Sequence, residues 1–341
     1  MSGGAAVIEW STDREAFQQQ AEAYRYQLQV HCYRMLGSLH EAEDLVQETF
    51  LRAWRARERF EGRSSFRNWL YRIATNACLN AIAARAQSRR ILPDAFGPPS
   101  SEPLRGPGPG DADIAWLEPY PDTALNQVAD TAPGPESRYE LRESIQLAFI
   151  AAIQQLPARQ RAVLLLRDVL GWSANETAQL LDASVASVNS ALQRARATLE
   201  QQAGTLDVGA RSATDDEQRL LAERYLRTWE SSDMDGFAAL LKEDARLRMP
   251  PWTQWYLGRD AIRTFFGWVR QPRPNGGSRV TPTGANTQPA FAHYVLADDG
   301  SAFRAQSIQV VTVEHDQIAA LTAFLDTRLF PKFELPLTLP R

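Results

Sequence analysis

Cysteine, histidine and long apolar runs are all scarce in this 341-residue sequence. Its two cysteines, Cys32 and Cys78, fall inside apolar helical patterns, and its four histidines are scattered. Zinc sites and disulfide frameworks need closely spaced ligands or paired cysteines, so we expect no metal, no disulfide and no cofactor. No apolar run approaches the roughly 20 residues of a membrane helix, and residues 1–10 lack the pattern of a secretion signal. We therefore expect a cytoplasmic protein without membrane contact.

The net charge of −4 conceals two blocks of opposite sign. Counterion release from phosphate supplies most non-specific affinity for nucleic acid, so a negative average argues against such binding. However, residues 63–90 hold six arginines and no acid, and an acidic cluster precedes them at Glu41, Glu43, Asp44 and Glu48. Either block alone is consistent with an ordinary solvated surface. Together they predict two partners, one a polyanion and the other basic.

Two helical patterns predict an all-helical domain over residues 10–92. Within residues 42–54, apolar side chains recur at intervals of three and four, which is the spacing of one buried helix face. A second pattern of the same kind runs over residues 66–77. Ser64 and Ser65 precede it and are natural helix caps.

Proline, glycine, serine and aspartate dominate residues 93–135, a composition that cannot propagate a helix. We predict a linker there. It contains the motif "WLEPYPD", residues 116–122, whose two aromatic side chains are unexpected in a simple spacer. Two interpretations stay open: the motif docks on a domain surface, or it is an incidental apolar spot.

A helix-turn-helix is predicted within residues 136–205. Pro157 can open one helix and Gly171 can end it. Ser173 and Glu176 then form an S-x-x-E capping box for a short helix, and a longer helix follows after a tight turn. The residues of the longer helix expected to face inward are Val185, Val188, Leu192, Ala195 and Leu199.

Residues 212–333 change from helices to strands. Thr214 and Glu217 repeat the capping box and begin a helix, and a further helix is expected around residues 261–269. Apolar and polar residues then alternate, with the Asp-Gly pair at 299–300 as a hairpin turn. Helices followed by antiparallel strands predict an α+β domain.

Two blocks resemble the extracytoplasmic-function subfamily of bacterial sigma-70 factors. Region two is resembled by "AEDLVQETFLRAWRARERFEGRSSFRNWLYRIATNACLNA", residues 42–81, and region four by "LPARQRAVLLLRDVLGWSANETAQLLDASVASVNSALQRARATL", residues 156–199. The C-terminal third, with "WYLGRDAI" and the strands after it, is similar to SnoaL-like domains of the nuclear-transport-factor-two-like cone fold. The resemblance implies a multidomain chain: two all-α sigma domains, the second with the helix-turn-helix, and a C-terminal α+β cone-shaped domain.

The resemblance also implies a function: binding to core RNA polymerase, promoter recognition, DNA opening and transcription initiation. Region two would dock its acidic helix on the clamp helices of the β′ subunit, and region four would meet the β flap. The acidic block would then have a basic partner. The residues implied at the polymerase contact are Asp44, Gln47, Glu48 and Arg52.

The second helix of region two and the loop before it would open the minus-ten promoter element. Unstacked bases must be captured in pockets, at a cost of a few kcal/mol per base. Arginines can hold phosphate, and Asn76 and Asn80 can pair with base edges. Many relatives carry an acid at the position of Asn80, and an ordinary solvated face is the alternative for Arg72 and Asn76. The residues implied here are Arg63, Ser64, Ser65, Arg67, Arg72, Asn76 and Asn80.

The second helix of the helix-turn-helix would read the minus-thirty-five element in the major groove. Its front half is uncharged, whereas many relatives have a basic residue at the position of Asn189 or Ala191. Asn and Gln can bind adenine in bidentate fashion. Core polymerase would tether this weak contact to the one made by region two, which raises the effective concentration of each reading helix at its promoter element. The residues implied are Ser184, Ala186, Ser187, Asn189, Ser190, Gln193, Arg194 and Arg196.

The C-terminal domain has a candidate pocket for a small ligand. His293 could act as a base with Asp326 or Asp244, but a lone strand histidine is more often a packing residue, so we expect no catalysis. We expect intramolecular contacts with region two, region four or the linker, through which the domain modulates the sigma factor. The alternative is a SnoaL-like enzyme or ligand sensor fused to a DNA-binding regulator. The candidate pocket residues are Trp252, Trp255, Tyr256, His293, Tyr294 and Phe324.

Overall fold

The computed structural model describes residues 14–62, 64–85, 89–101, 113–129, 143–202, 214–269 and 277–341. These residues belong to two compact units. The first unit combines the N-terminal helices with the helix-turn-helix: Met1–Arg89, Ala124–Leu141 and Ala152–Gln202. The second combines the C-terminal domain with two earlier segments: Arg90–Thr123, Arg142–Ala151 and Ala203–Arg341. Much of the expected linker therefore belongs to the unit of the C-terminal domain.

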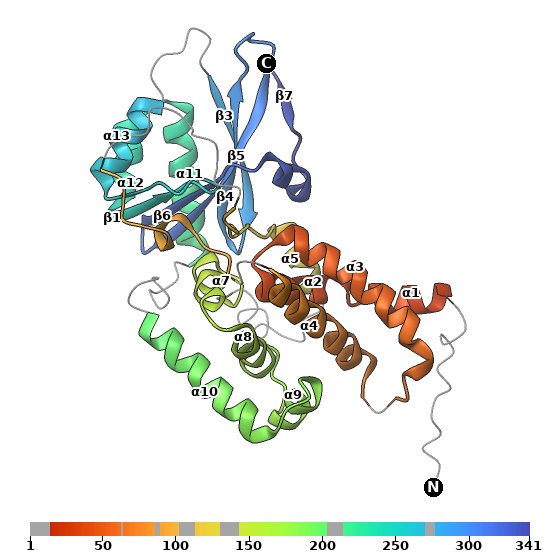
Figure 1. Cartoon of the computed structure of the whole chain (residues 1–341). Helices are drawn as coiled ribbons and strands as arrows, with labels where there is room; N and C mark the ends of the chain where they lie inside the picture. The colour runs from red at the N-terminus through yellow and green to blue at the C-terminus, as the bar shows by residue number, and fades with distance from the viewer. Residues whose placement is uncertain are drawn as a thin grey trace. The chain divides into compact units, whose positions relative to one another are not determined.

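Four helices begin the first unit (Figure 1). They are α1 (Arg14–Glu22), α2 (Arg25–Leu36), α3 (Leu39–Ala56) and α4 (Phe66–Ala84), with a single 3-10 turn, η2 (Arg57–Arg59), after α3. The side chain of Ser38 caps α3, and Ser65 caps α4 by accepting from the backbone N–H of Asn68 at 3.1 Å. Both expected helices therefore exist, and the expected serine cap of α4 is confirmed.

The helix-turn-helix follows. It consists of α9 (Ala174–Leu180) and α10 (Val185–Gln202). The elements before it are α7 (Leu147–Gln154), α8 (Ala158–Leu164) and a π-helical turn η4 (Leu165–Val169). Pro157 stands directly before α8, and Gly171 adopts a left-handed φ of 68° after the helix ends, as expected. The capping box of Ser173 and Glu176 is formed in both directions. The turn before α10 passes through Asp182, whose φ is 47°.

Most of the inward-facing residues of α10 are placed as expected, but Val185 is not. Val188 and Leu192 are buried, whereas Val185 is 37% exposed. Val185 is the first residue of α10, where the chain has only just left the tight turn. Val185 is the first member of the stripe that faces the neighbouring helices, and it lies at the exposed end of that stripe. The expectation for Val185 was therefore wrong.

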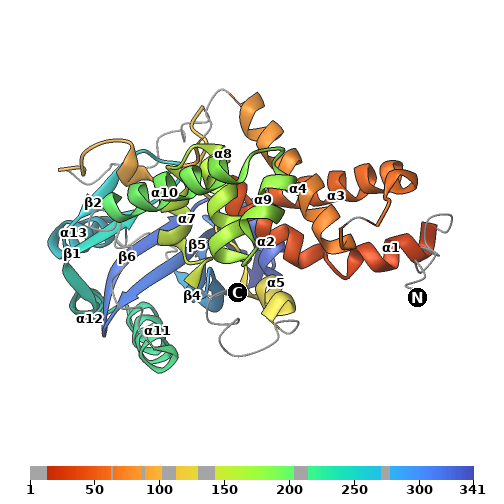
Figure 2. The same ribbon diagram turned by 90° about the horizontal axis from the view of Figure 1, so that it is seen from below.

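The C-terminal domain packs three helices against a mixed sheet (Figure 1 and Figure 2). The helices are α11 (Asp215–Glu230), α12 (Met234–Leu240) and α13 (Arg259–Val269). The strands are β1 (Leu241–Arg248), β2 (Trp255–Leu257), β3 (Ser278–Ala285), β4 (Gln288–Leu296), β5 (Ala302–Glu314), β6 (Gln317–Phe324) and β7 (Thr338–Pro340). The strand order is β2-β1-β6-β5-β4-β3, with β7 paired to β5. Among these strand pairs of the described residues, β1–β6 is parallel and the others are antiparallel.

The α+β expectation is confirmed in its local signals. The capping box of Thr214 and Glu217 is complete, and Gly300, with φ 66°, turns the chain between β4 and β5. The helices and the sheet share one apolar core, in which Tyr225 of α11 stacks on Phe291 of β4 with ring centroids 4.5 Å apart. Within the described ranges, no helix is long and apolar enough to cross a membrane.

Candidate nucleic-acid and polymerase interfaces

The expected polymerase contact lies on the outer face of α3. Asp44, Gln47 and Arg52 are exposed and Glu48 is half-buried. Arg52 donates from Nε to Oε1 of Glu48 at 2.7 Å, one helical turn away. An exposed pair of this kind contributes little to stability, so both side chains can exchange partners at small cost.

The acidic cluster before the arginine-rich block is divided by the fold. Glu41 forms an ion pair with Arg85, and Oε1 of Glu43 accepts from Nε2 of Gln29 at 3.3 Å. Asp44 instead points outward from α3. Half of the sequence cluster therefore serves contacts within the domain, and Asp44 and Glu48 carry the negative charge that a basic partner would meet.

The expected minus-ten surface runs along α4 and the loop before it. Ser64, Ser65, Arg72 and Asn80 are exposed, and Arg67 and Asn76 are half-buried. The guanidinium of Arg67 lies 4.9 Å from the ring centroid of Tyr71. Arg63 lies outside the described residues.

Aromatic side chains that the sequence analysis did not select flank the same loop. The half-buried rings of Phe60 and Trp69 have centroids 4.8 Å apart, and Phe66 lies 5.8 Å from Trp69. The signal was available, since these aromatics frame the segment "EGRSSFR". An aromatic cluster beside a basic loop suits the stacking of unpaired bases.

The expected minus-thirty-five surface is the solvent side of α10. The eight residues that the sequence analysis selected are all exposed: Ser184, Ala186, Ser187, Asn189, Ser190, Gln193, Arg194 and Arg196. Ser184 caps the helix by accepting from the backbone N–H of Ser187 at 3.1 Å. The front half of α10 therefore offers short, uncharged side chains that allow close approach to a base edge.

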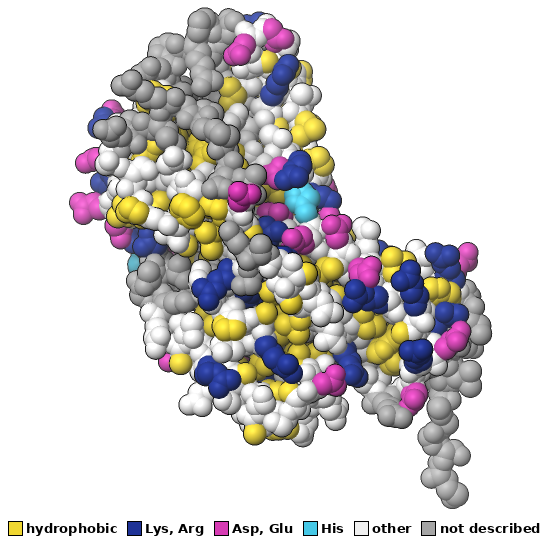
Figure 3. Space-filling model, in the orientation of Figure 1, with side chains coloured by type: hydrophobic (Ala, Val, Ile, Leu, Met, Phe, Trp, Pro, Cys, Tyr) yellow, Lys and Arg dark blue, Asp and Glu magenta, His cyan; other side chains and the backbone are white. Residues whose placement is uncertain are grey.

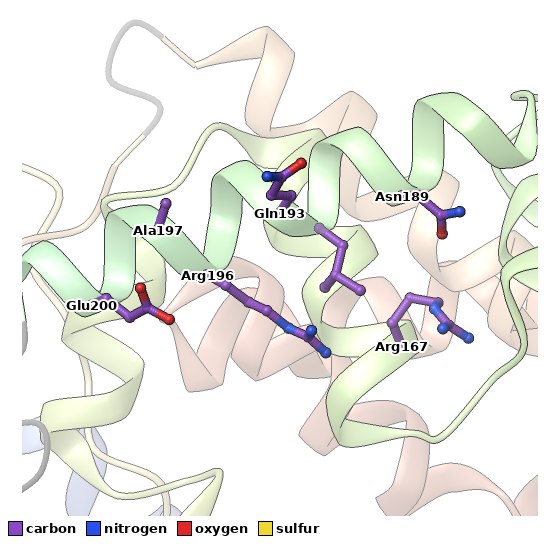
Figure 4. A pocket seen from close by; sticks show the side chains of 7 residues that line it. Arg167, Asn189, Gln193, Arg196, Ala197 and Glu200 are labelled. Atoms are coloured by element: carbon purple, nitrogen blue, oxygen red, sulfur yellow. The ribbon is translucent and has the colours of Figure 1, made fainter.

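A groove of about 550 Å³ lies beside the middle of α10 (Figure 4). Arg196 donates two hydrogen bonds to Asp168, at 2.9 and 2.7 Å, and this pairing raises the pKa of Arg196. Arg167, which the sequence analysis missed within an apolar helical run, comes from η4 and hydrogen-bonds to the carbonyl of Trp172. The residues lining the groove are Arg167, Asn189, Leu192, Gln193, Arg196, Ala197 and Glu200.

On the face drawn in Figure 3, acidic and basic side chains lie scattered among apolar and uncharged ones. Charges are also mixed at the helix-turn-helix, where the carboxylate of Asp168 partly neutralises the guanidinium of Arg196.

The candidate pocket residues of the C-terminal domain do not face one cavity. His293 lies against Trp229 of α11, with ring centroids 5.0 Å apart. Tyr294, the next residue of β4, points to the other face of the sheet, where its hydroxyl donates to the carbonyl of Pro336 at 3.0 Å. Adjacent strand residues face opposite sides, which separates these two side chains.

The remaining candidate pocket residues serve packing. Tyr256 lies 4.9 Å from the ring of Phe265, and Phe324 is buried. Trp252 is partly buried against the core, and Nε1 of Trp255 donates to the carbonyl of Gly97 at 2.8 Å. Tyr256 therefore belongs to the core between helices and sheet, Trp252 packs against that core, and Trp255 binds the preceding segment.

The motif "WLEPYPD" docks on the C-terminal domain. Tyr120 is fully buried, and its backbone N–H donates to Oδ1 of Asn286 at 2.9 Å. The N–H of Asn286 donates to the carbonyl of Tyr120, also at 2.9 Å, and Asp122 accepts from the N–H of Thr287 at 2.8 Å. The first of the two interpretations of the motif thus describes the structure.

The same turn of the C-terminal domain holds the chain that leads into α7. Nδ2 of Asn286 donates to the carbonyl of Ile145 at 2.7 Å. Oε1 of Gln288 accepts from the backbone N–H of Leu147, the first residue of α7, at 3.1 Å. The first backbone N–H groups of a helix lack partners inside the helix, so Gln288 acts as its cap.

Three family models match the chain: Sigma-70 region 2 over residues 21–89, Sigma-70 region 4 over residues 146–199, and the SnoaL-like domain over residues 222–321. Together they account for the N-terminal helices, the helix-turn-helix and the C-terminal sheet.

Curated relatives match the chain over different lengths. The chain is 45% identical over 324 residues to the ECF RNA polymerase sigma factor SigG of Mycobacterium tuberculosis, covering 95% of this chain and 85% of that one. It is 32% identical over 193 residues to the ECF RNA polymerase sigma factor SigW of Bacillus subtilis, which covers 56% of this chain and 90% of SigW.

A solved structure has the same fold. The extracytoplasmic function sigma factor SigJ of Mycobacterium tuberculosis superposes with a TM-score of 0.58 and 19% identity, over 94% of this chain and 99% of that one. With two sigma-70 regions in order and a full-length relative at 45% identity, this chain belongs to the extracytoplasmic-function family of RNA polymerase sigma factors.

Proposed function

We propose that three surfaces divide the work of this sigma factor, which directs core RNA polymerase to promoters. The outer face of α3 binds the clamp helices of the β′ subunit through Asp44, Gln47 and Glu48. The outer face of α4 and the loop before it hold the opened minus-ten element. The front half of α10 reads the minus-thirty-five element, and the helix-turn-helix meets the β flap.

The observation that carries this assignment is the exposure of all eight selected residues on α10 and its cap. Asn189 and Gln193 are one helical turn apart on that helix, so both amides can enter one major groove. Each good bidentate amide–adenine pair contributes about 1–3 kcal/mol of discrimination against a wrong base. The few basic groups nearby add little non-specific affinity, so recognition depends on core polymerase bringing both reading helices to the DNA.

The C-terminal domain modulates this activity through the linker and the start of region four. Support comes from Asn286 and Gln288, whose side chains bind Tyr120, Ile145 and Leu147. Because Gln288 caps the first helix of region four, the C-terminal domain helps to fix the residue at which that helix begins. Because its own aromatic residues fill its interior, intramolecular contact describes this domain better than catalysis.

Transcription with purified components tests the proposal. Core polymerase with the full-length chain should initiate at a defined set of promoters, which sequencing of the transcripts identifies. The same chain without core should bind duplex DNA weakly. A chain cut near Gly209 should select the same start sites with a changed yield. Absence of a complex with core would refute the assignment, and an unchanged yield would remove the modulating role of the domain.

A further inference from the structure

The first helix of the chain, α1, buries two of its side chains, Phe17 and Ala21. Gln18 and Gln19, on its other side, are exposed. None of the residues assigned above to the polymerase or to DNA lies on α1. In Figure 1 this helix lies next to the end of α3 that leads toward α4. Any part that α1 plays in promoter reading must therefore act through the residues that its buried side chains touch.

Phe17 contacts both ends of the segment between α3 and α4, residues 57–65, which we name the joining segment. The centroid of its ring lies 5.3 Å from that of Trp54, in the last turn of α3, and 5.8 Å from that of Phe66, the first residue of α4. Interplanar angles of 61° and 87° give the edge-to-face geometry that aromatic pairs prefer. The Phe17 ring is only 3% exposed, so it is enclosed between these two helix ends.

The joining segment itself lies largely at the surface. Among its described residues, Arg57 and Phe60 are half-buried and the others are exposed: Glu58, Arg59, Glu61, Gly62, Ser64 and Ser65. Segments with few buried apolar contacts are the ones that open most readily. The course of the joining segment therefore depends strongly on whatever holds its two ends.

Ring contacts continue from Phe66 to the two aromatic side chains that flank the joining segment. The centroid of Phe66 lies 6.2 Å from that of Phe60 and 5.8 Å from that of Trp69, and the last two rings are 4.8 Å apart. On the α3 side, the guanidinium of Arg57 lies 3.9 Å from the centroid of the Trp54 ring. We name the connected rings the aromatic chain: Trp54, Phe17, Phe66, Phe60 and Trp69.

The rings of Phe60 and Trp69 are those that unpaired bases of the minus-ten element can stack on. Base capture has to offset the free energy of unpairing the duplex. If the two rings had to be ordered at the moment of capture, the conformational entropy lost would be subtracted from the stacking free energy. Contacts that fix the rings in advance avoid this loss, so a side chain that never touches DNA can change how well the duplex is opened.

We propose that Phe17 is a positioning residue for promoter opening. From α1 it fixes both ends of the joining segment, and it thereby holds the rings of Phe60 and Trp69 where unpaired bases stack on them. The inference rests on the proposed function, because it takes α4 and the loop before it as the surface that holds the opened minus-ten element. It adds to that surface a helix that carries no DNA-contacting residue.

DNA binding by variants of the full chain tests the proposal. Phe17→Ala removes the ring that links α3 to α4. The complex of this variant with core polymerase should bind a single-stranded oligonucleotide of the minus-ten element about fivefold more weakly or worse, while its affinity for core changes by less than about twofold. Phe17→Met fills the same space and can contact both rings through its sulfur, so it should restore binding to within about twofold of wild type.

A spectroscopic measurement separates positioning from affinity. The fluorescence of 2-aminopurine, placed at an adenine of the minus-ten strand, is quenched when the base stacks on an aromatic ring. At saturating sigma–core complex all of the strand is bound, so the remaining fluorescence reports stacking geometry alone. The Phe17→Ala complex should quench less than the wild type, and the Phe17→Met complex should quench as the wild type does.

Ile82→Ala is the matched control for general destabilisation of region two. Ile82 is 3% exposed and lies on α4, about 24 Å along the helix from Phe66 at about 1.5 Å per residue. At a temperature where both variants are folded, Ile82→Ala should leave strand affinity and quenching unchanged. An equal loss in this control would show that the effect of Phe17→Ala is ordinary destabilisation, and the positioning role would be overturned.

The remaining outcomes separate the two proposals. If the Phe17→Ala complex binds the strand and quenches 2-aminopurine as the wild type does, the positioning role is overturned and the sigma assignment stands. If Phe17→Ala does not fold, Trp54→Leu makes the same test from the α3 side, and unchanged binding and quenching there overturn the role equally. If the wild-type complex shows no preference for the minus-ten strand over an unrelated one, the proposed function itself fails.

Discussion

Asn286 and Tyr120 bind each other through two hydrogen bonds across 166 positions of the chain: Oδ1 and N–H of Asn286 each engage the backbone of Tyr120 at 2.9 Å. The same side chain also holds the carbonyl of Ile145. One buried amide thus holds both the linker, at Tyr120, and the segment just before α7, at Ile145, on the C-terminal domain.

Replacing this amide should therefore weaken the C-terminal unit. Asn286→Ala leaves two buried backbone groups without their partner and puts alanine at a φ of 56°. We expect a loss of about 2–4 kcal/mol in the free energy of unfolding, measured by urea denaturation of the full chain. Chymotrypsin should also cleave faster within residues 116–121.

Asn286→Gly separates the two contributions to that loss. Glycine accepts the left-handed conformation but lacks the amide, so it should recover about 1 kcal/mol of the loss and none of the protease protection. Wild-type stability and protection in both variants would show that the amide does not hold the linker.

Charge reversal on α3 should disrupt binding to core polymerase. Asp44→Lys with Glu48→Lys replaces two outward carboxylates with cations, and we expect at least tenfold weaker association in a binding assay with purified core. Glu58→Lys, an exposed acid just beyond the end of α3, is the matched control and should bind normally. Equal affinity for the double variant and the wild type would remove this face from the polymerase contact.

Substitutions on α10 should separate base reading from phosphate attraction. Asn189→Ala or Gln193→Ala should reduce preference for the native minus-thirty-five sequence by about 1–3 kcal/mol, or roughly 5- to 150-fold. Asp168→Asn releases Arg196 from its ion pair and should strengthen binding to any sequence, more so at low salt. Competition binding of the sigma–core complex at several salt concentrations measures both the sequence preference and the non-specific affinity. If Asp168→Asn changed the sequence preference, the separation of base reading from phosphate attraction would be contradicted.

His31 should make the stability of the first unit depend on pH. It is 1% exposed and hydrogen-bonded to Thr75 at 2.9 Å, and burial, aided by nearby Arg34 and Arg67, lowers its pKa from 6.5 to about 3. The unfolded chain therefore binds a proton below about pH 6.5 that the folded chain refuses until about pH 3. Stability is lost as the pH falls through this window, by about 2 kcal/mol at pH 5.

His31→Gln keeps a hydrogen-bonding group beside Thr75 and removes the titration. Urea unfolding of wild type and variant between pH 7 and pH 5 should show a steeper decline for the wild type. Parallel curves would contradict a buried neutral histidine.

Local signals predicted local structure well. The caps at Ser65, Ser173 and Thr214 depend on residues three positions away, and the sequence contains both partners. The two sigma regions and the α+β domain were predictable because their apolar residues recur at the regular spacing of a helix face or of one face of a strand. His293 and Tyr294 are neighbours in one strand, so their side chains point to opposite faces of the sheet. Strand alternation therefore already argued against placing both in one pocket.

Long-range partners were not predictable in this way. Arg161 lies three and four positions before Leu164 and Leu165, on a stripe that periodicity assigns to the core, and nothing local identifies the carbonyl of Met35 as its partner. Asn286 likewise looks like an ordinary turn residue until the linker is placed beside it. The sequence contains the donor and the acceptor in each case, but only the fold brings them together.

The turn between β3 and β4 has one further consequence. Asn286 and Thr287 both adopt left-handed backbone conformations, with φ 56° and 58°, and threonine is β-branched and resists that geometry. Asp122 and Tyr120 hold these two residues from a segment far upstream. The hairpin and the upstream segment should therefore acquire their native shape in a single cooperative step, and a fragment starting at Thr214 would be an incomplete folding unit.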